Sequence, residues 1–330
     1  MARIARLSVI AALVVAVSSS FVSAQQPEAK QKQAKAAPTS GEAKPAPDIA
    51  NVVYGPHERN VFDLWKAKRD MPTPLVVYIH GGGFRANSKE SVSAQLLKAC
   101  LDSGISVAAT NYRLSPEYQF PTHYMDSARA IQFLRSKAKE YNLDPKRVAA
   151  TGASAGGATS LWIAFHDDMA DPNNPDPVLR ESTRLTCVAV VDAQSTYDPR
   201  VIKQIIGGSG ELFKPLLAFY GLEPDEVDSD RAHQLYEAAS PINYATADDP
   251  PVWMHYREAK GRLPDNAGSG QGSHHPNFGY SLKDKLDKLG VGCIVRHASE
   301  YPGQRTPIRA AERGTSGEMV DFFKRQFGMQ

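Results

Sequence analysis

Short apolar runs alternate along the chain with longer stretches in which apolar residues recur every three or four positions. The runs at Leu75–Ile79, Ile105–Ala109, Cys187–Val191 and Val252–Tyr256 are typical of strands that are buried on both faces of a sheet. Between these runs, apolar positions from Ala128 to Tyr141 repeat at helical spacing. The alternation predicts an α/β fold with a mainly parallel sheet covered by helices on both faces.

Further apolar segments complete the pattern. An early strand is predicted at Val61–Trp65 and a last strand at Cys293–Arg296. The segments from Phe278 to Leu289 and from Met319 to Phe327 have helical spacing. Residues from about 195 to 248 are helical and rich in turns, so we expect them to form a cap over the carboxyl ends of the strands.

The N-terminus differs in composition from the rest of the chain. Arg3 and Arg6 accompany an apolar core from Leu7 to Val17, and small residues end at Ala24. This pattern predicts a secretory signal peptide over residues 1–24, because the apolar core is too short for a membrane span. An uncleaved membrane anchor is the alternative interpretation. We expect a secreted or periplasmic protein whose mature chain has no membrane span.

Two regions follow the predicted signal peptide. Residues 25–48 are rich in Gln, Lys, Ala and Pro without an apolar period, which predicts a flexible linker. Residues 49–330 are enough for one large α/β domain. The formal net charge is +2, and it becomes zero when the two arginines of the signal peptide are removed. Because residues 49–330 contain no basic run, nucleic acid is not an expected partner.

A serine at the end of a predicted strand provides the first candidate for chemistry. Gly152-Ala153-Ser154-Ala155-Gly156 fits G-x-S-x-G, a tight turn from strand to helix that exposes a serine hydroxyl. The segment Arg147–Thr151 before it is predicted as a strand, and the apolar stretch Leu161–Phe165 after it as a helix. The glycines leave room where the strand bends abruptly into the helix. The alternative is a serine that only caps a helix.

A second glycine-rich segment, His80-Gly81-Gly82-Gly83, follows the apolar run Leu75–Ile79. Its pattern fits an oxyanion loop, whose backbone N–H groups point at the charge that develops on an attacked carbonyl. It does not have the G-x-x-x-x-G-K-[ST] pattern of a phosphate-binding loop. The two motifs supply a nucleophile and hydrogen-bond donors, so they predict acyl transfer. We expect His80 to shape the turn rather than to act as a base.

The segments around these motifs resemble a known family. HGGGF at 80–84, NYRLSPE at 111–117, Phe120-Pro121 and GASAGG at 152–157 are similar to segments of α/β-hydrolase esterases. The resemblance is closest to the hormone-sensitive-lipase-like group and to the bifunctional feruloyl and acetyl-xylan esterases. It covers the chain from about Asn51 to the C-terminus.

The resemblance implies an α/β-hydrolase fold: a mainly parallel central sheet, helices on both faces and a helical cap insertion. It also implies that the backbone N–H groups of Gly82, Gly83 and Ala155 form the oxyanion hole.

The same fold bears on the cysteines. It places the strands of Cys187 and Cys293 on either side of a third strand, which separates the two residues by about 10 Å. Because a disulfide requires a Cα separation below about 7 Å, we expect these two residues and Cys100 to be buried free thiols.

The histidine and the acid of a serine triad do not stand where the resemblance implies. A serine hydroxyl needs a histidine to take its proton and an acid to orient that histidine. In the resembling esterases the histidine follows the last strand, but residues 298–304 contain none. The implied position of the acid falls near Lys260. Glu258, just before it, is the predicted acid, and Asp265 is the alternative.

Three histidines are candidate bases. His274 and His275 lie in the glycine-rich loop 261–277, which can fold back over the edge of the sheet. His297 lies at the end of the last predicted strand. We predict His275 as the base, with His297 and His274 as alternatives. In the non-catalytic interpretation, His274 and His275 belong to an exposed polar loop, and His297 is a strand histidine bonded to backbone.

Adjacent histidines rarely chelate one ion, and no further ligand spacing is visible in the sequence, so we predict neither a metal site nor a cofactor. The motifs together predict an exported serine esterase for small-molecule or glycan esters, with Ser154 as nucleophile. From the resemblance alone, acetyl or feruloyl esters of polysaccharides are the expected substrates. A catalytically degraded hydrolase that binds glycans or esters, and a serine peptidase, are the alternatives. The oligomeric state is not predicted.

Overall fold

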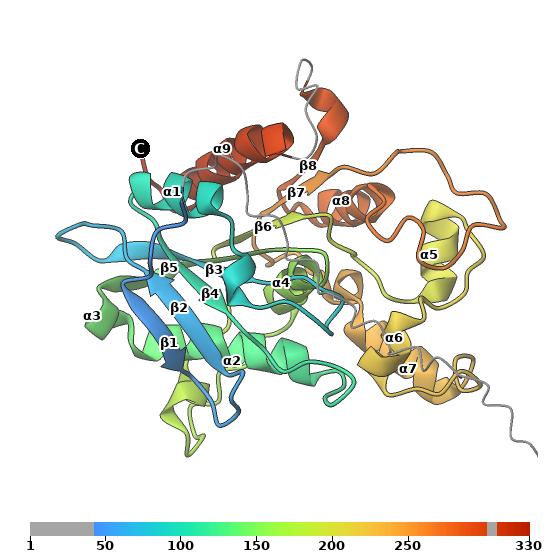
Figure 1. The fold of residues 1–330 in the computed structure, drawn as a ribbon, viewed down its shortest axis with the longest axis horizontal. Coiled ribbons are helices and arrows are strands. Elements are labelled where there is room, and N and C mark those ends of the chain that lie inside the picture. The colour runs from blue at the N-terminus through green and yellow to red at the C-terminus, as the bar shows by residue number, and fades with distance from the viewer. Residues whose placement is uncertain (1–42, 302–308) are drawn as a thin grey trace, which may run out of the picture. The chain divides into compact units, whose positions relative to one another are not determined.

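An eight-stranded sheet with the strand order β1-β2-β4-β3-β5-β6-β7-β8 forms the centre of the molecule (Figure 1). The computed structural model describes residues 43–301 and 309–330, with side chains from Ser316 onward in the second range. The predicted signal peptide 1–24 and residues 25–42 of the predicted linker lie outside the described residues.

Only the β1–β2 and β2–β4 pairs among the described strands are antiparallel, and every pair from β4 to β8 is parallel. The strands are β1 Ile49–Val53, β2 Val61–Trp65, β3 Thr73–Ile79, β4 Ser106–Thr110, β5 Leu143–Ala153, β6 Cys187–Val191, β7 Val252–Tyr256 and β8 Cys293–His297. The carboxyl ends of the parallel strands therefore lie at one edge of the sheet, where ligands bind in folds of this kind.

Helices cover both faces of the sheet. Helices α1 and α9 pack side by side on one face, and α2, α3, α4 and α8 pack on the other (Figure 1). These helices are α1 Ala94–Asp102, α2 Thr122–Ser136, α3 Ala138–Tyr141, α4 Ala155–Phe165, α8 Asn277–Leu289 and α9 Arg309–Gln326. Four 3-10 turns among the described residues are η1 Lys89–Ser91, η2 Pro177–Arg180, η3 Pro241–Tyr244 and η4 Ala298–Glu300.

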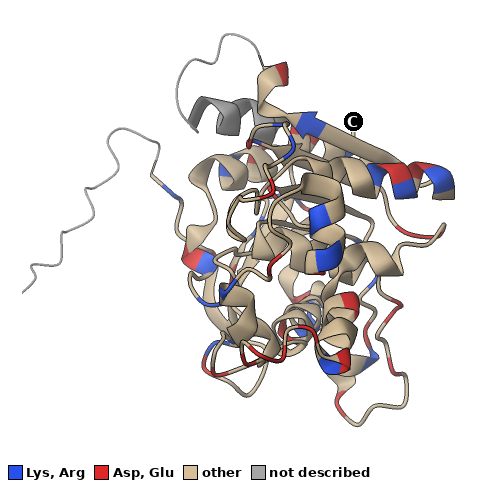
Figure 2. Ribbon diagram, turned by 90° about the vertical axis from the view of Figure 1, so that its right-hand side faces the viewer, with Lys and Arg blue, Asp and Glu red and all other residues tan. Residues whose placement is uncertain are grey.

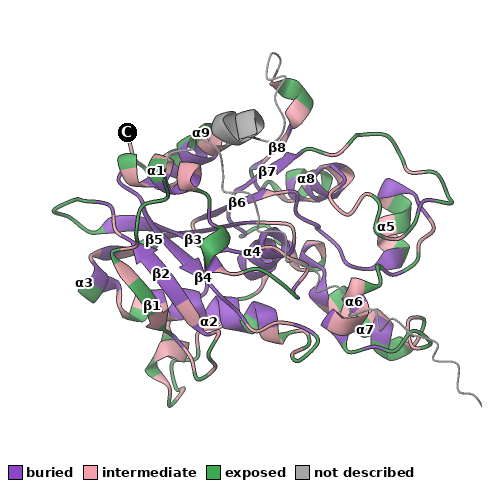
Figure 3. Ribbon diagram, viewed as in Figure 1, coloured by how far each residue is buried: buried purple, intermediate pink, exposed green. Residues whose placement is uncertain are grey.

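The predicted α/β architecture is confirmed, and the observed limits of β6 and β7 match the predicted apolar runs. The predicted helix from Ala128 to Tyr141 is divided into α2 and α3 at Lys137. Strand β1 has no counterpart in the sequence prediction. It is an edge strand with half-buried and exposed residues only, so it contains no continuous apolar run (Figure 3).

The last residues of the predicted linker contact the domain. The Trp65 indole N–H donates to the carbonyl of Pro45 at 2.9 Å, and the backbone N–H of Lys66 donates to the Asp48 carboxylate at 2.7 Å. Both bonds hold the segment against the end of β2. The ordered domain therefore begins before residue 49.

A helical segment follows β6 and lies toward the carboxyl ends of the strands. It contains α5 Pro199–Ile206, α6 Pro215–Tyr220 and α7 Asp230–Ala239 (Figure 1). The ring of Phe219 in α6 stacks on the ring of Phe84, with 4.1 Å between the centroids. Phe84 directly follows the three glycines, so this aromatic contact joins the cap to the predicted oxyanion loop.

The three cysteines are buried and free, as predicted. Strand β7 lies between β6, which carries Cys187, and β8, which carries Cys293. Burial raises the pKa of each thiol above its ordinary value.

Along the ribbon on the side of the molecule that carries the cap, acidic and basic residues are interspersed (Figure 2). In the described part of the chain, every helix is too short or too polar to cross a membrane.

Three buried histidines make the stability of the fold depend on pH. Burial lowers the pKa of His80, His123 and His255 to about 4. In the unfolded chain a histidine titrates near 6.5. Between these two values the unfolded chain binds protons that the folded chain does not, so acid favours unfolding.

We therefore predict that the free energy of unfolding falls as the pH is lowered from about 6.5 towards 4, by up to ~1.4 kcal/mol per pH unit for each of the three histidines. Urea denaturation at pH 7.5, 6, 5 and 4.5 measures this dependence. A free energy of unfolding that stays constant between pH 7.5 and 5 would contradict it.

Candidate active site

Ser154 occupies a strained turn between β5 and α4. Its φ of 52° and ψ of −124° are rare for a residue with a side chain, because Cβ crowds the backbone there. The turn is tight: a Cβ on Gly156 would lie 2.0 Å from the carbonyl oxygen of Ile79. Only glycine fits at that position, which explains the second glycine of the G-x-S-x-G motif. The hydroxyl of Ser154 is thereby held at the N-terminus of α4.

The predicted oxyanion residues surround the same point. Ala155 is the first residue of α4, and the first N–H groups of a helix have no acceptor within the helix. Gly83 has a φ of +61°, and a Cβ added to it would meet no atom within 4 Å, so its backbone faces open space. Gly82, Gly83, Ser154 and Ala155 all line one cavity. This arrangement can place N–H donors around a carbonyl oxygen next to Ser154.

His80 stabilises this loop from behind. Its Nδ1 lies 2.8 Å from the carbonyl of Gly81, and its ring stacks on Tyr112 with 4.2 Å between centroids. The Tyr112 hydroxyl donates to the carbonyl of His80 at 2.8 Å. The ring is fully buried and lies outside the cavity lining, in agreement with a turn-shaping role.

His274 is the histidine that reaches the serine. Its Nε2 lies 2.9 Å from the Ser154 Oγ, which is hydrogen-bond distance. When Nδ1 carries the ring proton, Nε2 accepts the hydroxyl hydrogen of Ser154. His274 is therefore placed to take that proton during attack.

His275, the base favoured by the sequence, points elsewhere. Its Nε2 lies 2.9 Å from the carbonyl of Gly261, and its Nδ1 accepts the backbone N–H of Asn277 at 3.1 Å. The ring is buried, and both nitrogens are used to close the loop. The structure thus replaces His275 with His274 as the candidate base. Because the two residues are adjacent in a loop without regular spacing, nothing in the sequence decides between them.

Glu258 is the carboxylate nearest to the base. Its Oε1 lies 3.6 Å from the Nδ1 of His274, close enough for an ion pair although too long for a hydrogen bond. Asp265 is exposed, and within the described residues it makes no ion pair or hydrogen bond with either loop histidine. The geometry therefore favours Glu258 over Asp265 as the orienting acid.

The backbone on both sides of Glu258 is held in place. The N–H of Arg257 donates to the Asp192 carboxylate at 3.1 Å, and the Arg257 Nε donates to the same carboxylate at 2.8 Å. The carbonyl of Glu258 lies 2.8 Å from the Nε2 of His297. His297, the third candidate base, is buried, and its Nδ1 accepts the N–H of Ser299. Its ring contacts the backbone of the candidate acid and does not contact Ser154.

Sequence reasoning missed Gln194. Its side-chain amide donates to the carbonyl of Ser273 at 2.6 Å, and the Tyr197 hydroxyl donates to its Oε1 at 3.3 Å. Gln194 follows β6, and Ser273 precedes His274, so the amide joins the end of a strand to the loop of the candidate base. No motif marks Gln194.

The cavity in front of Ser154 has a volume of about 430 Å³. Its walls are mostly apolar, and they come from the oxyanion loop, the cap and α8: Phe84, Tyr197, Ile202, Ile206, Leu216 and Phe278. Within the described part of the chain, no group of three or more His, Cys, Asp and Glu side chains is arranged to hold a metal ion. The site therefore combines a candidate nucleophile and a candidate base with an apolar pocket.

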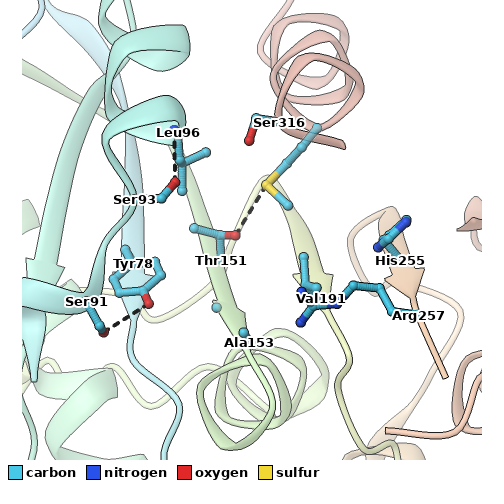
Figure 4. A pocket seen from close by; sticks show the side chains of 12 residues that line it. Tyr78, Ser91, Ser93, Leu96, Thr151, Ala153, Val191, His255, Arg257 and Ser316 are labelled. Carbon is cyan, nitrogen blue, oxygen red and sulfur yellow. Dashed lines mark hydrogen bonds between the residues drawn. The ribbon is translucent and has the colours of Figure 1, made fainter. Parts of the chain in front are cut away.

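A second cavity, of about 200 Å³, lies on the other side of β5 (Figure 4). It is lined by Thr151 and Ala153 of β5, by α1 and α9, and by His255 of β7. The ring of His255 is buried, and neither nitrogen has a hydrogen-bond partner among the described residues. Since the Ser154 side chain does not line this cavity, we do not assign it to the candidate active site.

The strained backbone of Ser154 leads to a prediction about stability. Replacing Ser154 with Gly removes the Cβ that opposes φ = 52°, whereas replacing it with Ala keeps that Cβ. We expect Ser154→Gly to exceed Ser154→Ala in free energy of unfolding by about 1 kcal/mol. Urea denaturation of the two variants is the measurement. Because glycine also lowers stability by about 0.5–1 kcal/mol through the entropy of the unfolded chain, a Ser154→Gly variant that is less stable than Ser154→Ala by that amount would show that the turn stores no strain.

Known proteins share both sequence and fold with this chain. The model of the BD-FAE family matches residues 62–263. Esterase LipQ of Mycobacterium tuberculosis is 26% identical over 226 residues, which cover 66% of this chain and 50% of LipQ. The chain thus spans about half the length of these curated relatives, LipQ and a probable carboxylic ester hydrolase, LipM, of the same organism.

Two solved structures have the same fold. An acetyl ester-xyloside bifunctional hydrolase from Caldicellulosiruptor lactoaceticus superimposes with a TM-score of 0.66 at 20% identity, covering 86% of this chain and 99% of its own. A truncated carbohydrate esterase from gut microbiota gives 0.64 at 21% identity, covering 84% and 95%. The predicted α/β-hydrolase fold is confirmed. Because the family model matches more than half of this chain, the chain belongs to the BD-FAE family.

Proposed function

We propose that this protein is an exported serine esterase that hydrolyses small acyl esters. The 2.9 Å contact between His274 and Ser154 carries the proposal, because it joins a histidine base to a serine that already lies beside backbone donors. The names of the relatives, an esterase and an acetyl ester-xyloside hydrolase, support ester hydrolysis. Ser154 is the nucleophile, His274 the base and Glu258 the orienting acid.

In the first half of the reaction Ser154 Oγ attacks the carbonyl carbon of the ester while His274 Nε2 takes the hydroxyl proton. The negative charge that forms on the carbonyl oxygen is held by the N–H groups of Gly82, Gly83 and Ala155. The bond from the carbonyl carbon to the alcohol oxygen then breaks, and His274 returns the proton to the departing alcohol. An acyl group stays on Ser154.

Water completes the reaction by the same route. His274 takes a proton from the water as the water attacks the acyl carbon, and it then protonates Ser154 Oγ as the carboxylic acid leaves. Glu258 stabilises the positive charge that His274 carries in each half. For this, the 3.6 Å distance between Glu258 and Nδ1 must shorten in the substrate complex, a common change on substrate binding.

The apolar cavity favours an acyl group larger than formyl and without charge. Its volume of about 430 Å³ is within the range of small-molecule sites and accommodates an acetyl or a feruloyl group. We propose acetyl or feruloyl esters of polysaccharides as substrates, on the basis of the family and of the xyloside-related neighbour. Release of acetate or ferulate from acetylated and feruloylated xylan, measured by chromatography, tests this choice.

Export rests on the N-terminal sequence, which predicts a signal peptide over residues 1–24. Intact-mass analysis of the protein recovered from the periplasm or medium decides between cleavage near Ala24 and a retained anchor.

The role of Ser154 as nucleophile can be tested by removing its hydroxyl. We expect purified protein to hydrolyse p-nitrophenyl acetate and Ser154→Ala to lower kcat by about 10⁴-fold or more, because the hydroxyl that contacts His274 and forms the acyl-enzyme is lost. A fluorophosphonate probe should label the wild type and leave Ser154→Ala unlabelled.

Three other results would change the assignment. Equal rates of p-nitrophenyl acetate hydrolysis by wild type and Ser154→Ala would contradict the esterase proposal. Tight binding of an ester or glycan without turnover would favour the binding-protein alternative. Hydrolysis of peptides in preference to esters would favour the peptidase.

Substitutions at positions 274 and 275 separate the roles of the two loop histidines. We expect His274→Gln to lower kcat by about 10³-fold or more, because the base is lost, and His275→Gln to change it by less than about fivefold. Glutamine keeps an amide donor and acceptor at position 275, so the loop can remain closed. Thermal unfolding of both variants controls for folding. A larger loss of kcat in His275→Gln would return the base to His275.

A further inference from the structure

The loop that carries His274 is bound to the carboxyl end of cap helix α5. The last carbonyl groups of a helix have no N–H partner within the helix. In α5, Pro199–Ile206, the carbonyl of Gln204 accepts from Arg262 Nη1 at 2.8 Å, and the carbonyl of Ile206 accepts from the N–H of Leu263 at 2.8 Å. The carbonyl of Ile205 accepts from the side-chain amide of Asn277 at 2.7 Å.

These bonds lie on both sides of the candidate base in the sequence. Arg262 and Leu263 precede His274, and Asn277 follows it as the first residue of α8. Between them, the N–H of Ser209, just beyond α5, donates to the carbonyl of Ala267 at 3.2 Å. Figure 1 shows the chain after β7 passing beside α5 before it enters α8. The loop is therefore attached to α5 at its beginning and at its end, and its middle is attached to Ser209 in the segment that follows α5.

The same helix forms a wall of the substrate cavity. Ile202 and Ile206 of α5 line the cavity together with Ser154 and His274. An acyl group that fills the cavity therefore contacts the helix that holds the base. A helix that lines the substrate cavity and also binds the loop of a proposed catalytic group allows substrate binding energy to support alignment in the transition state.

We propose that α5 sets the position of His274 through its carbonyl end, with Asn277 as the main positioning residue, so that acyl groups in contact with α5 are hydrolysed with the base best aligned. This inference rests on the proposed function. Asn277 is the main candidate because its bond is the shortest of the set and is half-buried, whereas the Arg262 bond is exposed.

Asn277→Asp tests the inference with little change in shape. The carboxylate has no N–H to donate to Ile205, and a negative charge at the N-terminus of α8 favours that helix, so loss of α8 does not explain an effect. Asn277→Gln keeps an amide donor and serves as the rescue variant. Asn243→Asp is the matched control, because the Asn243 amide donates to the carbonyl of Glu237 near the end of α7 and does not touch the base loop.

The expected result is a fall in kcat for p-nitrophenyl butyrate of about tenfold in Asn277→Asp, with KM within about twofold. The fall in kcat should be smaller for p-nitrophenyl acetate, because its shorter acyl group contacts α5 less. Asn277→Gln should recover part of kcat, and Asn243→Asp should match the wild type. Hydrogen exchange of peptides from 262–276 should rise in Asn277→Asp, while peptides from β7 and from the second half of α8 stay unchanged.

Three other outcomes would contradict either the inference about α5 or the proposed function. Faster exchange in 262–276 with unchanged kcat would show that α5 holds the loop without positioning the base. Unchanged exchange and unchanged kcat would overturn the inference. If the wild type hydrolyses no ester, the proposed function fails instead, and the exchange data alone then decide whether α5 holds the loop.

Discussion

The hydrogen bond between Ser154 and His274 joins two residues that lie 120 positions apart in the chain, and most of the fold around it serves to fix its two ends. The serine end is fixed by the sheet, because β5 and α4 leave Ser154 one strained backbone conformation. The histidine end belongs to a loop that contains no helix or named strand. Its position depends on polar contacts to Gln194 in the segment after β6, to α5 and within the loop itself. Alignment of the site is therefore decided mainly on the histidine side.

The candidate acid, Glu258, is held by the strands on either side of β7. Glu258 directly follows β7, and its neighbour Arg257 is bound to Asp192 at the end of β6. The carbonyl of Glu258 is bound by His297 at the end of β8. Two strands that flank β7 thus hold the turn that carries the carboxylate. The Nδ1 of His297 accepts the N–H of Ser299, and its Nε2 faces the Glu258 carbonyl.

The sequence was sufficient for those parts of the fold in which local pattern and tertiary environment agree. Buried parallel strands are continuous apolar runs, so β6 and β7 could be placed to the residue, and the nucleophile turn carries glycines that steric contacts require. The choice of His274 over His275 could not be predicted. It depends on which ring turns towards β5, and that is decided by bonds to Gly261 and Gln194, which are distant in sequence. Strand β1 was missed because a half-exposed edge strand needs no apolar run.

The three buried thiols bear on the conditions in which the fold can persist. Burial raises the pKa of Cys100 and Cys293 to about 12, so at neutral pH almost none of either is thiolate. Thiolate is the form that attacks disulfides and reacts with oxidants, and buried thiols are also out of their reach. The domain therefore requires no oxidant or disulfide isomerase to reach its native covalent state. Its structure should be the same in a reducing cytosol as in an oxidising compartment outside the cell.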